Sequence, residues 1–517
     1  MRILKNCYFV LGLFMLLTFS NPLTAQTSKY PAATSRARKE FPDEEGFSNS
    51  RIQQMGKDGL LLTAQSIKAE KGISSYRYSI INSNLQEIQH NILGVDRVRI
   101  GSGMITKSFL GPTHFHQLFL GKKKFVIHSI SRSGLEKPIE VEGEFPINGR
   151  IEFVTVLQEK FIITMKSKSA ISLLFFDWKT GDVVLTPVEL PKGVKAKKVT
   201  ILSFQELSNI NEIATVLRIK GKSPSRNLCM MHSANGDLIR SIDISPKQED
   251  VTIIECRISS PAQNKFIFAG TYNNRLQKMA EGVFIAESDN TGLKYLTTTT
   301  FLELKNFTDY MPERTQNYIN KRVERAENAG RKMTLDYYVT IHPLVSTADG
   351  YFLVGEAYYS VYHTETSVVN GKTTRSQVFD GLQYTHAVLV KFDLNGKRIM
   401  DQCLPMKKFV SAGQLLGTRD VPRFITLNVS VPYQIAMSFV VDKYLIYKVF
   451  NHSGTEISRN QCEVVAKGNE NEVIQGASSS LQHWYDSYFV FYGYQTMKNS
   501  DGKKRVSFYI DKLEIGN

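Results

Sequence analysis

The sequence predicts an all-β fold, a β-propeller of four-stranded blades with one helical insertion, and three observations support this class. Short runs rich in Val, Ile, Phe and Tyr fill most of the 517 residues, and turn residues bound them. A corner of Asp, Asn or Ser that ends in Gly recurs along the chain, closing at Gly134, Gly181, Gly236, Gly292, Gly396 and Gly454. These glycines are 47, 55, 56, 104 and 58 residues apart, which fits one blade per step and one blade enlarged by an insertion.

The chemistry of this corner predicts a hairpin turn. In Asp393-Leu394-Asn395-Gly396, the Asp and Asn side chains can accept hydrogen bonds from nearby backbone N–H groups, and the glycine can adopt a positive φ. The alternation of Asp and Asn also suits calcium, but a calcium loop would need a Glu six residues after the glycine, where Gln402 stands. We therefore predict plain antiparallel hairpins at the corners and no metal site.

The composition indicates one large ordered domain. With 42% hydrophobic and 11% aromatic residues, the chain can bury an ample core. Length alone would allow two or three domains. Because a single blade cannot bury both of its faces, the regular spacing favours one closed array.

The N-terminus predicts export. Arg2 and Lys5 precede an apolar stretch over residues 8–19, and small residues follow as far as Ala25, which is the order of a secretory signal peptide. The apolar stretch is shorter than the roughly 20 residues that a membrane-spanning helix needs, and no later segment is long and apolar enough to span a membrane. We predict a signal peptide at 1–25, a polar leader at 26–57 and a propeller domain at 58–517, located in the periplasm, on the outer surface or outside the cell.

Five successive units of strand-like runs follow the leader. Each unit has runs of the length expected for strands, separated by Gly, Asn, Asp or Ser. The runs lie within residues 60–82, 98–130, 151–176, 200–231 and 251–287.

The sixth unit carries insertions. Its strands are predicted at 337–341, 351–359 and 386–393, and residues 309–332 before them are predicted to form a helix. Asp309 can cap the start of this helix, Pro312 suits its first turn and Gly330 its end. A loop insertion at 361–381 separates two strands of the same unit. Insertions in repeat proteins tend to lie on a binding face.

The end of the chain predicts how the ring closes. A seventh unit covers residues 424–450, and the last runs, at 488–494 and 505–513, leave no room for an outer strand. An N-terminal strand could complete that last sheet and remove its open edge. We predict eight blades, or seven if the first and last units share one.

The densest group of reactive side chains lies in the sixth unit. Glu356 stands in the otherwise apolar run 352–357, where a buried carboxylate needs hydrogen-bond partners or a shifted pKa. One interpretation is a polar pocket with Glu356 as acid, base or ligand anchor, and the other is a buried Glu that fixes the insertion in place. The candidate pocket residues are Glu356, Tyr358, His363, Asp380, Tyr384 and His386.

Other motifs give weaker signals. His114 and His116 have the spacing of two metal ligands on one strand face, but no third ligand is identifiable. The sequence carries no cofactor motif, so we expect none. Four cysteines lie far apart in the sequence and form no Cys-x-x-Cys motif, so we expect them to be buried free thiols, although an exported protein can form disulfides. The cysteines concerned are Cys229, Cys256, Cys403 and Cys462.

The charge of the chain constrains its partners. The formal net charge is +15, and the basic residues gather in corners and loops. They are not interleaved with stacking aromatic residues as in a nucleic-acid-binding groove, so we expect no nucleic-acid partner. Attraction to an anionic envelope surface or an acidic glycan remains open.

One stretch resembles a known group of proteins. Residues 351–401, with Gly355-Glu356-Ala357-Tyr358-Tyr359 and Asp393-Leu394-Asn395-Gly396, resemble exported bacterial propeller-like proteins that are uncharacterised. The junction Leu23-Thr24-Ala25-Gln26 resembles exported proteins of Bacteroidetes-type bacteria. These resemblances imply a propeller and export, and they imply no activity.

Two functional hypotheses follow. The first is an exported propeller scaffold that binds an envelope protein or glycan, because the repeat and the signal peptide are present and a catalytic signature is absent. The alternative is a hydrolase or lyase that acts on an anionic polysaccharide at the polar site of the sixth blade. The sequence leaves open whether the protein is an enzyme.

Overall fold

The computed structural model describes residues 33–515 except for short internal gaps. The predicted signal peptide at 1–25 lies outside the described residues. The gaps fall at 43–45, 102–103, 222–224, 248–250, 263, 275–277, 370–371, 416–420, 442–443, 464–472 and 499–500.

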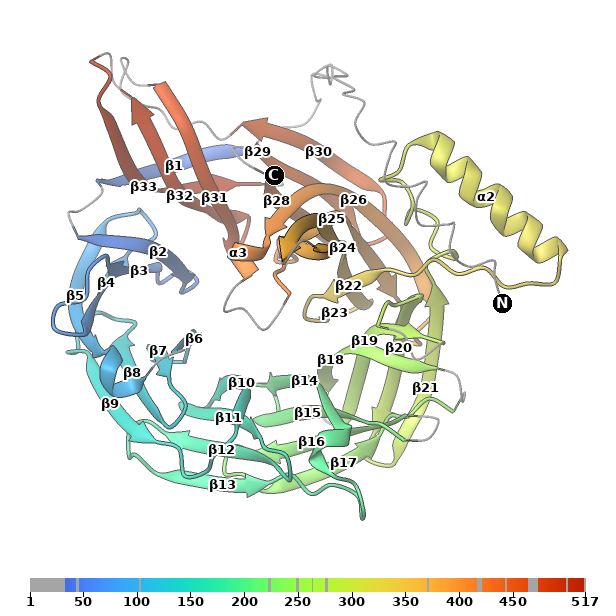
Figure 1. Cartoon of the computed structure of the whole chain (residues 1–517), viewed down its shortest axis with the longest axis horizontal. Helices are drawn as coiled ribbons and strands as arrows, with labels where there is room; N and C mark the ends of the chain where they lie inside the picture. Colours follow the sequence, from blue (N-terminus) through green and yellow to red (C-terminus); the bar gives the residue numbers. More distant parts are fainter. Residues whose placement is uncertain are drawn as a thin grey trace.

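The described residues form eight antiparallel sheets that surround a central channel like the blades of a propeller (Figure 1). In blades 1 to 4 the strands run in chain order from the centre outward. They are β2 (Phe47–Gln54), β3 (Leu60–Ser66), β4 (Ile73–Ile81) and β5 (Glu87–Asp96); β6 (Ile105–Leu110), β7 (His114–Leu120), β8 (Lys124–Ser131) and β9 (Ile139–Glu144); β10 (Arg150–Leu157), β11 (Lys160–Lys166), β12 (Ile171–Asp177) and β13 (Val183–Pro187); β14 (Val199–Leu207), β15 (Glu212–Ile219), β16 (Arg226–Ser233) and β17 (Leu238–Asp243).

Blades 5 to 8 follow the same plan, except that two short strands share the inner edge of blade 6. The strands are β18 (Thr252–Ala262), β19 (Lys265–Asn273), β20 (Gly282–Asp289) and β21 (Gly292–Thr300); β22 (Tyr338–Ile341) and β23 (Val345–Thr347), then β24 (Gly350–Val369), β25 (Lys372–Phe392) and β26 (Arg398–Ser411); β27 (Thr426–Asn428), β28 (Gln434–Val441), β29 (Tyr444–Asn451) and β30 (Glu456–Glu463); β31 (Val473–Tyr485), β32 (Tyr488–Lys498) and β33 (Lys504–Glu514), completed by β1 (Thr34–Pro42). Eight blades are therefore confirmed.

The N-terminal strand closes the ring, as the missing outer strand predicted. β1 pairs antiparallel with β33 along its whole length. The polar leader predicted at 26–57 is wrong at residues 34–42 and 47–54, because β1 and β2 occupy them. An outer strand needs few apolar residues. A salt bridge helps to hold this one, in which the Arg36 guanidinium lies 2.6 Å from the Glu514 carboxylate. Its polar composition therefore gave it the appearance of a leader.

The hydrophobic core lies between neighbouring blades. Phe268 and Phe284 of blade 5, for example, pack with Cys229 and Met231 of blade 4, and all four are fully buried. Each blade thus buries both faces against its neighbours, as a closed array requires.

The recurring corners are hairpin turns between the third and fourth strands of the blades. At Asp393, Oδ1 accepts hydrogen bonds from the backbone N–H groups of Asn395 (2.9 Å) and Lys397 (2.8 Å). Gly396 has φ +78°, and a Cβ there would lie 2.3 Å from the ring of Tyr295, so only glycine fits. The predicted hairpin corner is confirmed at this position.

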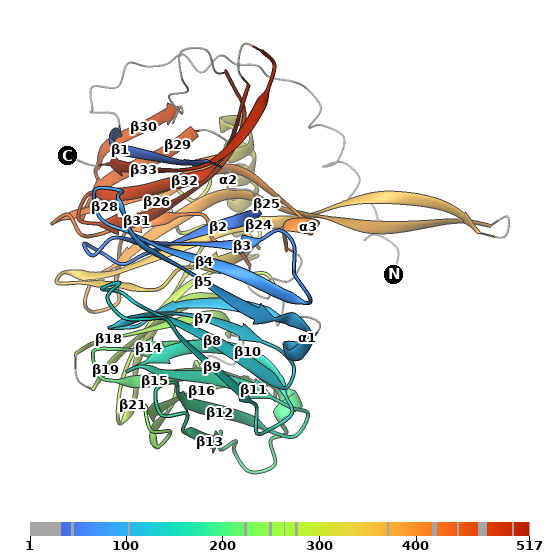
Figure 2. The same ribbon diagram turned by 90° about the vertical axis from the view of Figure 1, so that its left-hand side faces the viewer.

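The enlarged blade 6 contains the predicted helix and an unpredicted ribbon. Helix α2 (Glu313–Asn328) lies within the predicted 309–332 and stands outside the ring (Figure 1). The loop predicted at 361–381 is instead the outer part of β24 and β25, a two-stranded hairpin that projects far from one end of the ring (Figure 2). Its Thr, Val, Tyr and Phe residues suit extended strands, which a loop prediction overlooked.

Three further features complete the description of the fold. No helix in the described parts of the chain is long and apolar enough to cross a membrane. Cys229, Cys256 and Cys403 are buried free thiols, and Cys462 is a half-buried one. Two short helices complete the elements, α1 (Arg97–Ile100) and α3 (Ala412–Leu415), together with the 3₁₀ turn η1 (Ala196–Lys198).

Candidate functional site

Glu356 ties two blades together. Its side chain is fully buried, and its Oε1 accepts hydrogen bonds from the backbone N–H groups of Phe424 and Ile425, each at 2.7 Å. The same oxygen lies 2.7 Å from Nε2 of His342. His342 belongs to blade 6, and Phe424 and Ile425 belong to the chain leading into blade 7. The carboxylate therefore links the two blades and has a structural role.

Tyr358 and Tyr384 share the face of Glu356. Their ring centroids are 5.5 Å apart, and the Tyr384 hydroxyl donates to the carbonyl of Pro422 at 2.6 Å. Burial raises the pKa of Tyr358 to about 12 and also raises that of Tyr384. Both phenols therefore stay protonated at neutral pH and pack between blades 6 and 7.

His386 lies on the opposite face of the sheet. In the register of β24 and β25, Glu356 faces Ala387, so the neighbouring His386 points to the other side. Its ring stacks on Tyr310 with centroids 4.1 Å apart. Burial lowers the pKa of His386 to about 3, so the ring is neutral at physiological pH.

His363 and Asp380 lie on the projecting hairpin and are solvent-accessible. His363 Nδ1 hydrogen-bonds with Asp380, and its Nε2 is 3.3 Å from Oε1 of Glu365. The hydrogen bond to Asp380 and then the one to Glu365 raise the pKa of His363. The six predicted residues thus form three separate groups, and the single polar pocket expected around Glu356 does not form.

The other predicted histidines are packing residues. His114 and His116 each lie with their ring centroid 4.9 Å from that of Trp178, and burial lowers the pKa of His116 to about 4. Among the described residues, no group of three or more His, Cys, Asp or Glu side chains could hold a metal ion.

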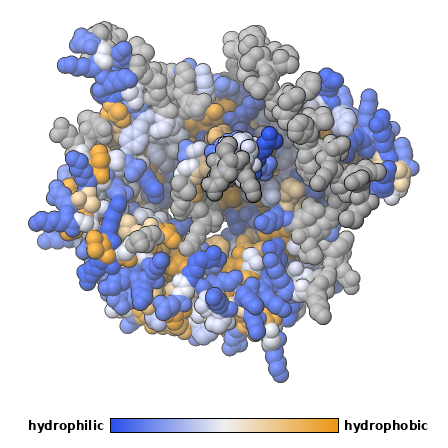
Figure 3. Space-filling view, in the orientation of Figure 1, coloured by the Kyte–Doolittle hydropathy of each residue, from blue (hydrophilic) through white to orange (hydrophobic). Residues whose placement is uncertain are grey.

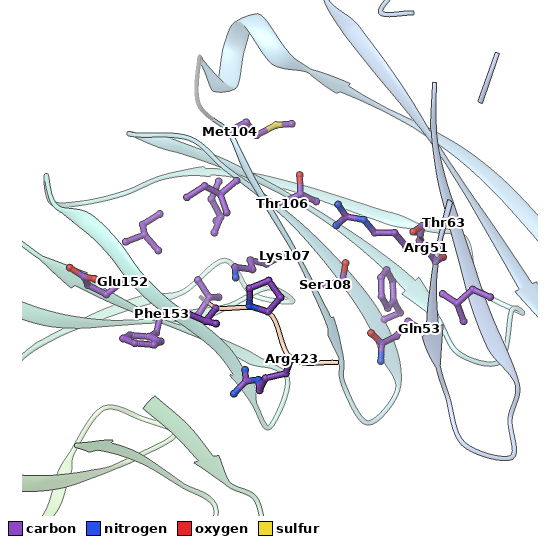
Figure 4. A pocket seen from close by; sticks show the side chains of 18 residues that line it. Arg51, Gln53, Thr63, Met104, Thr106, Lys107, Ser108, Glu152, Phe153 and Arg423 are labelled. Atoms are coloured by element: carbon purple, nitrogen blue, oxygen red, sulfur yellow. Dashed lines mark hydrogen bonds between the residues drawn. The ribbon is translucent and has the colours of Figure 1, made fainter. Parts of the chain in front are cut away.

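A hollow in the described structure lies in the central channel. It has a volume of about 830 Å³ and is bounded by the inner strands β2, β6 and β10 of blades 1 to 3. The connection at 421–423, which leads into blade 7, covers its opposite side (Figure 4). We call this hollow the central cavity.

Three cations line the central cavity. Arg51 comes from β2, Lys107 from β6 and Arg423 from the covering connection, and all three are exposed (Figure 4). Within the described part of the chain none of the three forms an ion pair, and Arg423 only donates to the carbonyl of Ile341 at 2.8 Å. The one lining carboxylate, Glu152, is paired with Arg150. The cavity therefore carries an excess of positive charge.

The rest of the lining is mixed. Gln53, Thr63, Thr106 and Ser108 offer neutral hydrogen-bonding groups, and Phe153 offers a partly exposed ring. A few convergent polar groups beside apolar surface are typical of a ligand site. The arrangement can bind a polar, anionic molecule with a face that packs on an aromatic ring.

Sequence reasoning missed this cavity for a physical reason. Arg51 lay in the residues assigned to the leader, and Lys107 and Arg423 are far from it in the sequence. They meet only because the inner strands of a propeller share one channel. Alternation within each inner strand could have indicated which side chains point inward, once the order of the blades was known.

Comparison with known proteins identifies no family for this chain. No family model and no curated protein matches the chain significantly. Among solved structures it is similar to the dihydro-heme d1 dehydrogenase NirN (TM-score 0.41, 9% identity, 92% of this chain and 79% of that chain). It is also similar to the Dos1 propeller (TM-score 0.40, 10% identity, 94% and 95%) and to the β-propeller domain of the Trilobed protease from Pyrococcus furiosus (TM-score 0.29, 8% identity, 90% and 94%). Because these TM-scores are low, the propeller assignment follows from this chain's own strand pairing.

Proposed function

We propose that this protein is an exported propeller scaffold that binds an anionic glycan of the cell envelope in its central cavity. The observation that carries the proposal is the convergence of Arg51, Lys107 and Arg423 on one cavity without carboxylate partners among the described residues. A guanidinium group can hold a carboxylate or phosphate through two parallel hydrogen bonds. Two guanidinium groups and the ammonium of Lys107 around one hollow favour an anion over a neutral sugar.

The size of the cavity supports a small-ligand site. Its volume of about 830 Å³ falls within the roughly 300–1,000 Å³ of typical ligand pockets. The neutral side chains around the cations match the hydroxyl groups of a sugar, and the ring of Phe153 can pack on its apolar face. Export, which the N-terminal residues predict, would bring the protein to the envelope where such glycans lie.

The catalytic alternative has less support. A general acid or base must reach the bond that it acts on. Glu356 is fully buried, its Oε1 is occupied by three partners, and His363 and Asp380 lie on the distant hairpin. The arrangement of the described residues therefore favours a binding protein over a hydrolase or lyase centred on Glu356.

Calorimetric titration with short uronic-acid oligomers tests the proposal. The wild-type protein should bind a galacturonate trimer, and the same trimer with methyl-esterified carboxylates should bind at least tenfold more weakly. The triple variant Arg51→Ser/Lys107→Ser/Arg423→Ser should lose binding. A matched control is Lys137→Ser/Lys179→Ser/Lys397→Ser, which removes three exposed cations from corners remote from the cavity. Equal binding of the charged and esterified trimers, or equal effects of the two triple variants, would refute the proposal.

A further inference from the structure

The two ends of the propeller differ in charge. The connections between the second and third strands of the blades lie at the end from which the β24–β25 hairpin projects. The connections from one blade to the next lie at the same end. We call this the hairpin end. The Asx and Gly corners lie at the other end, which we call the corner end.

An arc of lysines covers the hairpin end over blades 1 to 4. Its members lie in connections of these four blades, and the structure exposes each of them. They are Lys68, Lys71, Lys122, Lys123, Lys168, Lys192, Lys195, Lys197, Lys198 and Lys220. We call this set the basic arc.

The basic arc is not neutralised by acidic neighbours. Its lysines form no ion pair with any described residue, whereas nearby cations such as Lys124 (3.2 Å from Glu144) and Arg226 (2.7 Å from Asp243) do. Only two exposed acids, Glu70 and Glu189, lie in the same connections. The side chains of the arc are thus available to an anionic partner.

At the corner end of the same blades, acidic side chains accompany the basic ones. There Lys57 lies 3.0 Å from Asp486, and Arg132 pairs with Asp58. Further carboxylates stand in its turns, namely Glu136, Glu159, Asp177, Asp182 and Asp237. The excess of cations is therefore confined to the hairpin end and does not follow from the net charge of +15 alone.

The basic arc adjoins the central cavity. The arc covers blades 1 to 4, and the inner strands of blades 1 to 3 bound the cavity. Met104 and Arg423, which line the cavity, belong to connections between blades, so the cavity reaches the hairpin end. Figure 3 looks onto this end, where hydrophilic side chains alternate with hydrophobic ones over the lower half of the ring, which blades 3 and 4 occupy in Figure 1.

We infer that the basic arc and the central cavity form one continuous tract for a polyanionic glycan chain. This inference rests on the proposed function and extends it: the ligand is a polymer, one part of which enters the cavity while the rest runs over the connections of blades 1 to 4. Each lysine that meets a carboxylate or sulfate of the polymer displaces bound counterions, as in other polyelectrolyte complexes. Affinity should therefore rise with chain length and fall with salt.

The projecting hairpin favours a polymer over a flat lipid surface. Residues 361–369 and 372–380 extend beyond the ring as two paired strands, each of which at about 3.3 Å per residue is roughly 30 Å long. Its exposed side chains include His363, Glu365 and Arg375, which do not suit insertion into a bilayer. The hairpin would hold a planar membrane away from the basic arc, whereas a flexible chain can pass beside it.

A length series tests the inference separately from the proposed function. The wild-type protein would be titrated with galacturonate trimers and with chains of more than ten units, at low and at physiological salt. Long chains should bind more tightly and with the steeper salt dependence. The arc variant Lys195→Ser/Lys197→Ser/Lys198→Ser should weaken long-chain binding by about tenfold and leave trimer binding within twofold.

The matched control is again Lys137→Ser/Lys179→Ser/Lys397→Ser, which removes the same charge from the corner end and should change neither affinity more than twofold. Trimer binding without any gain from length, or equal losses in the arc and control variants, would overturn the inference and leave the proposed function standing. Failure of the wild-type protein to bind either length would refute both. Binding of anionic phosphatidylglycerol vesicles that the arc variant loses, without a matching loss of glycan binding, would assign the arc to a membrane and overturn the inference.

Discussion

Replacement of Glu356 distinguishes a structural carboxylate from a catalytic one. In Glu356→Ala, the backbone N–H groups of Phe424 and Ile425 lose their acceptor in a buried position. Each such loss costs about 1–3 kcal/mol, and the contact with His342 is lost as well, so we expect the free energy of unfolding to fall by about 4 kcal/mol. Glu356→Gln keeps an amide oxygen for the two N–H groups, and we expect a loss of only about 1 kcal/mol.

Urea denaturation followed by the fluorescence of the two tryptophans measures these changes. Glu365→Ala provides the control, since Glu365 is an exposed residue of the same strand, and its replacement should change stability by less than about 0.5 kcal/mol. A catalytic Glu356 would show another pattern, in which Glu356→Gln retains full stability and loses turnover. The structural argument is refuted if Glu356→Ala costs less than about 1 kcal/mol, or if Gln is as damaging as Ala.

Three further predictions concern the whole fold. Burial lowers the pKa of four histidines, His116, His128, His232 and His386, to about 3 or 4, so below pH 6.5 the unfolded chain binds more protons than the folded protein. As the pH falls from 6.5 toward 5, the free energy of unfolding should therefore decrease by up to about 1.4 kcal/mol per pH unit for each histidine. Constant stability in urea titrations between pH 7 and 5.5 would contradict this. Replacement of residues 361–380 by a two-residue turn should leave the melting temperature within a few degrees in calorimetry, because they project beyond the ring; a large decrease would mean that the hairpin supports the fold. Deletion of residues 34–42 should expose the edge of β33 and cause aggregation on size-exclusion chromatography, and a monomeric product as stable as the wild type would show that β1 is dispensable.

Much of the fold was predictable because propellers repeat a local rule. The glycine of each corner needs a positive φ, and Asp or Asn beside it accepts backbone N–H groups, so the turn is specified by consecutive residues such as 393–396. Strand edges and blade number follow from the spacing of such turns. The leader prediction is wrong at residues 34–42, because an outer strand like β1 is stabilised by pairing and charge more than by burial.

The candidate site was less predictable because its residues meet only in three dimensions. Glu356 was correctly singled out as a carboxylate that the core would not choose, but its partners Phe424 and Ile425 act through backbone N–H groups that any residue carries. Nothing in a side-chain pattern could therefore identify them. Arg51 and Arg423 line one cavity although the sequence separates them by most of the chain.

The turn chemistry also bears on how the charge asymmetry should be interpreted. Tight corners require Asp, Asn, Ser or Gly at fixed positions, so aspartates of the corner end such as Asp177 are explained by the fold itself. The connections at the hairpin end carry no such requirement, and they vary in length from a few residues, as at 145–149, to the long segment 301–337. Turn chemistry thus explains aspartates at the corner end, but it gives no reason for lysines to gather at the other end. The basic arc is the part of the asymmetry that the fold does not demand, and for this reason it is the part to test for function.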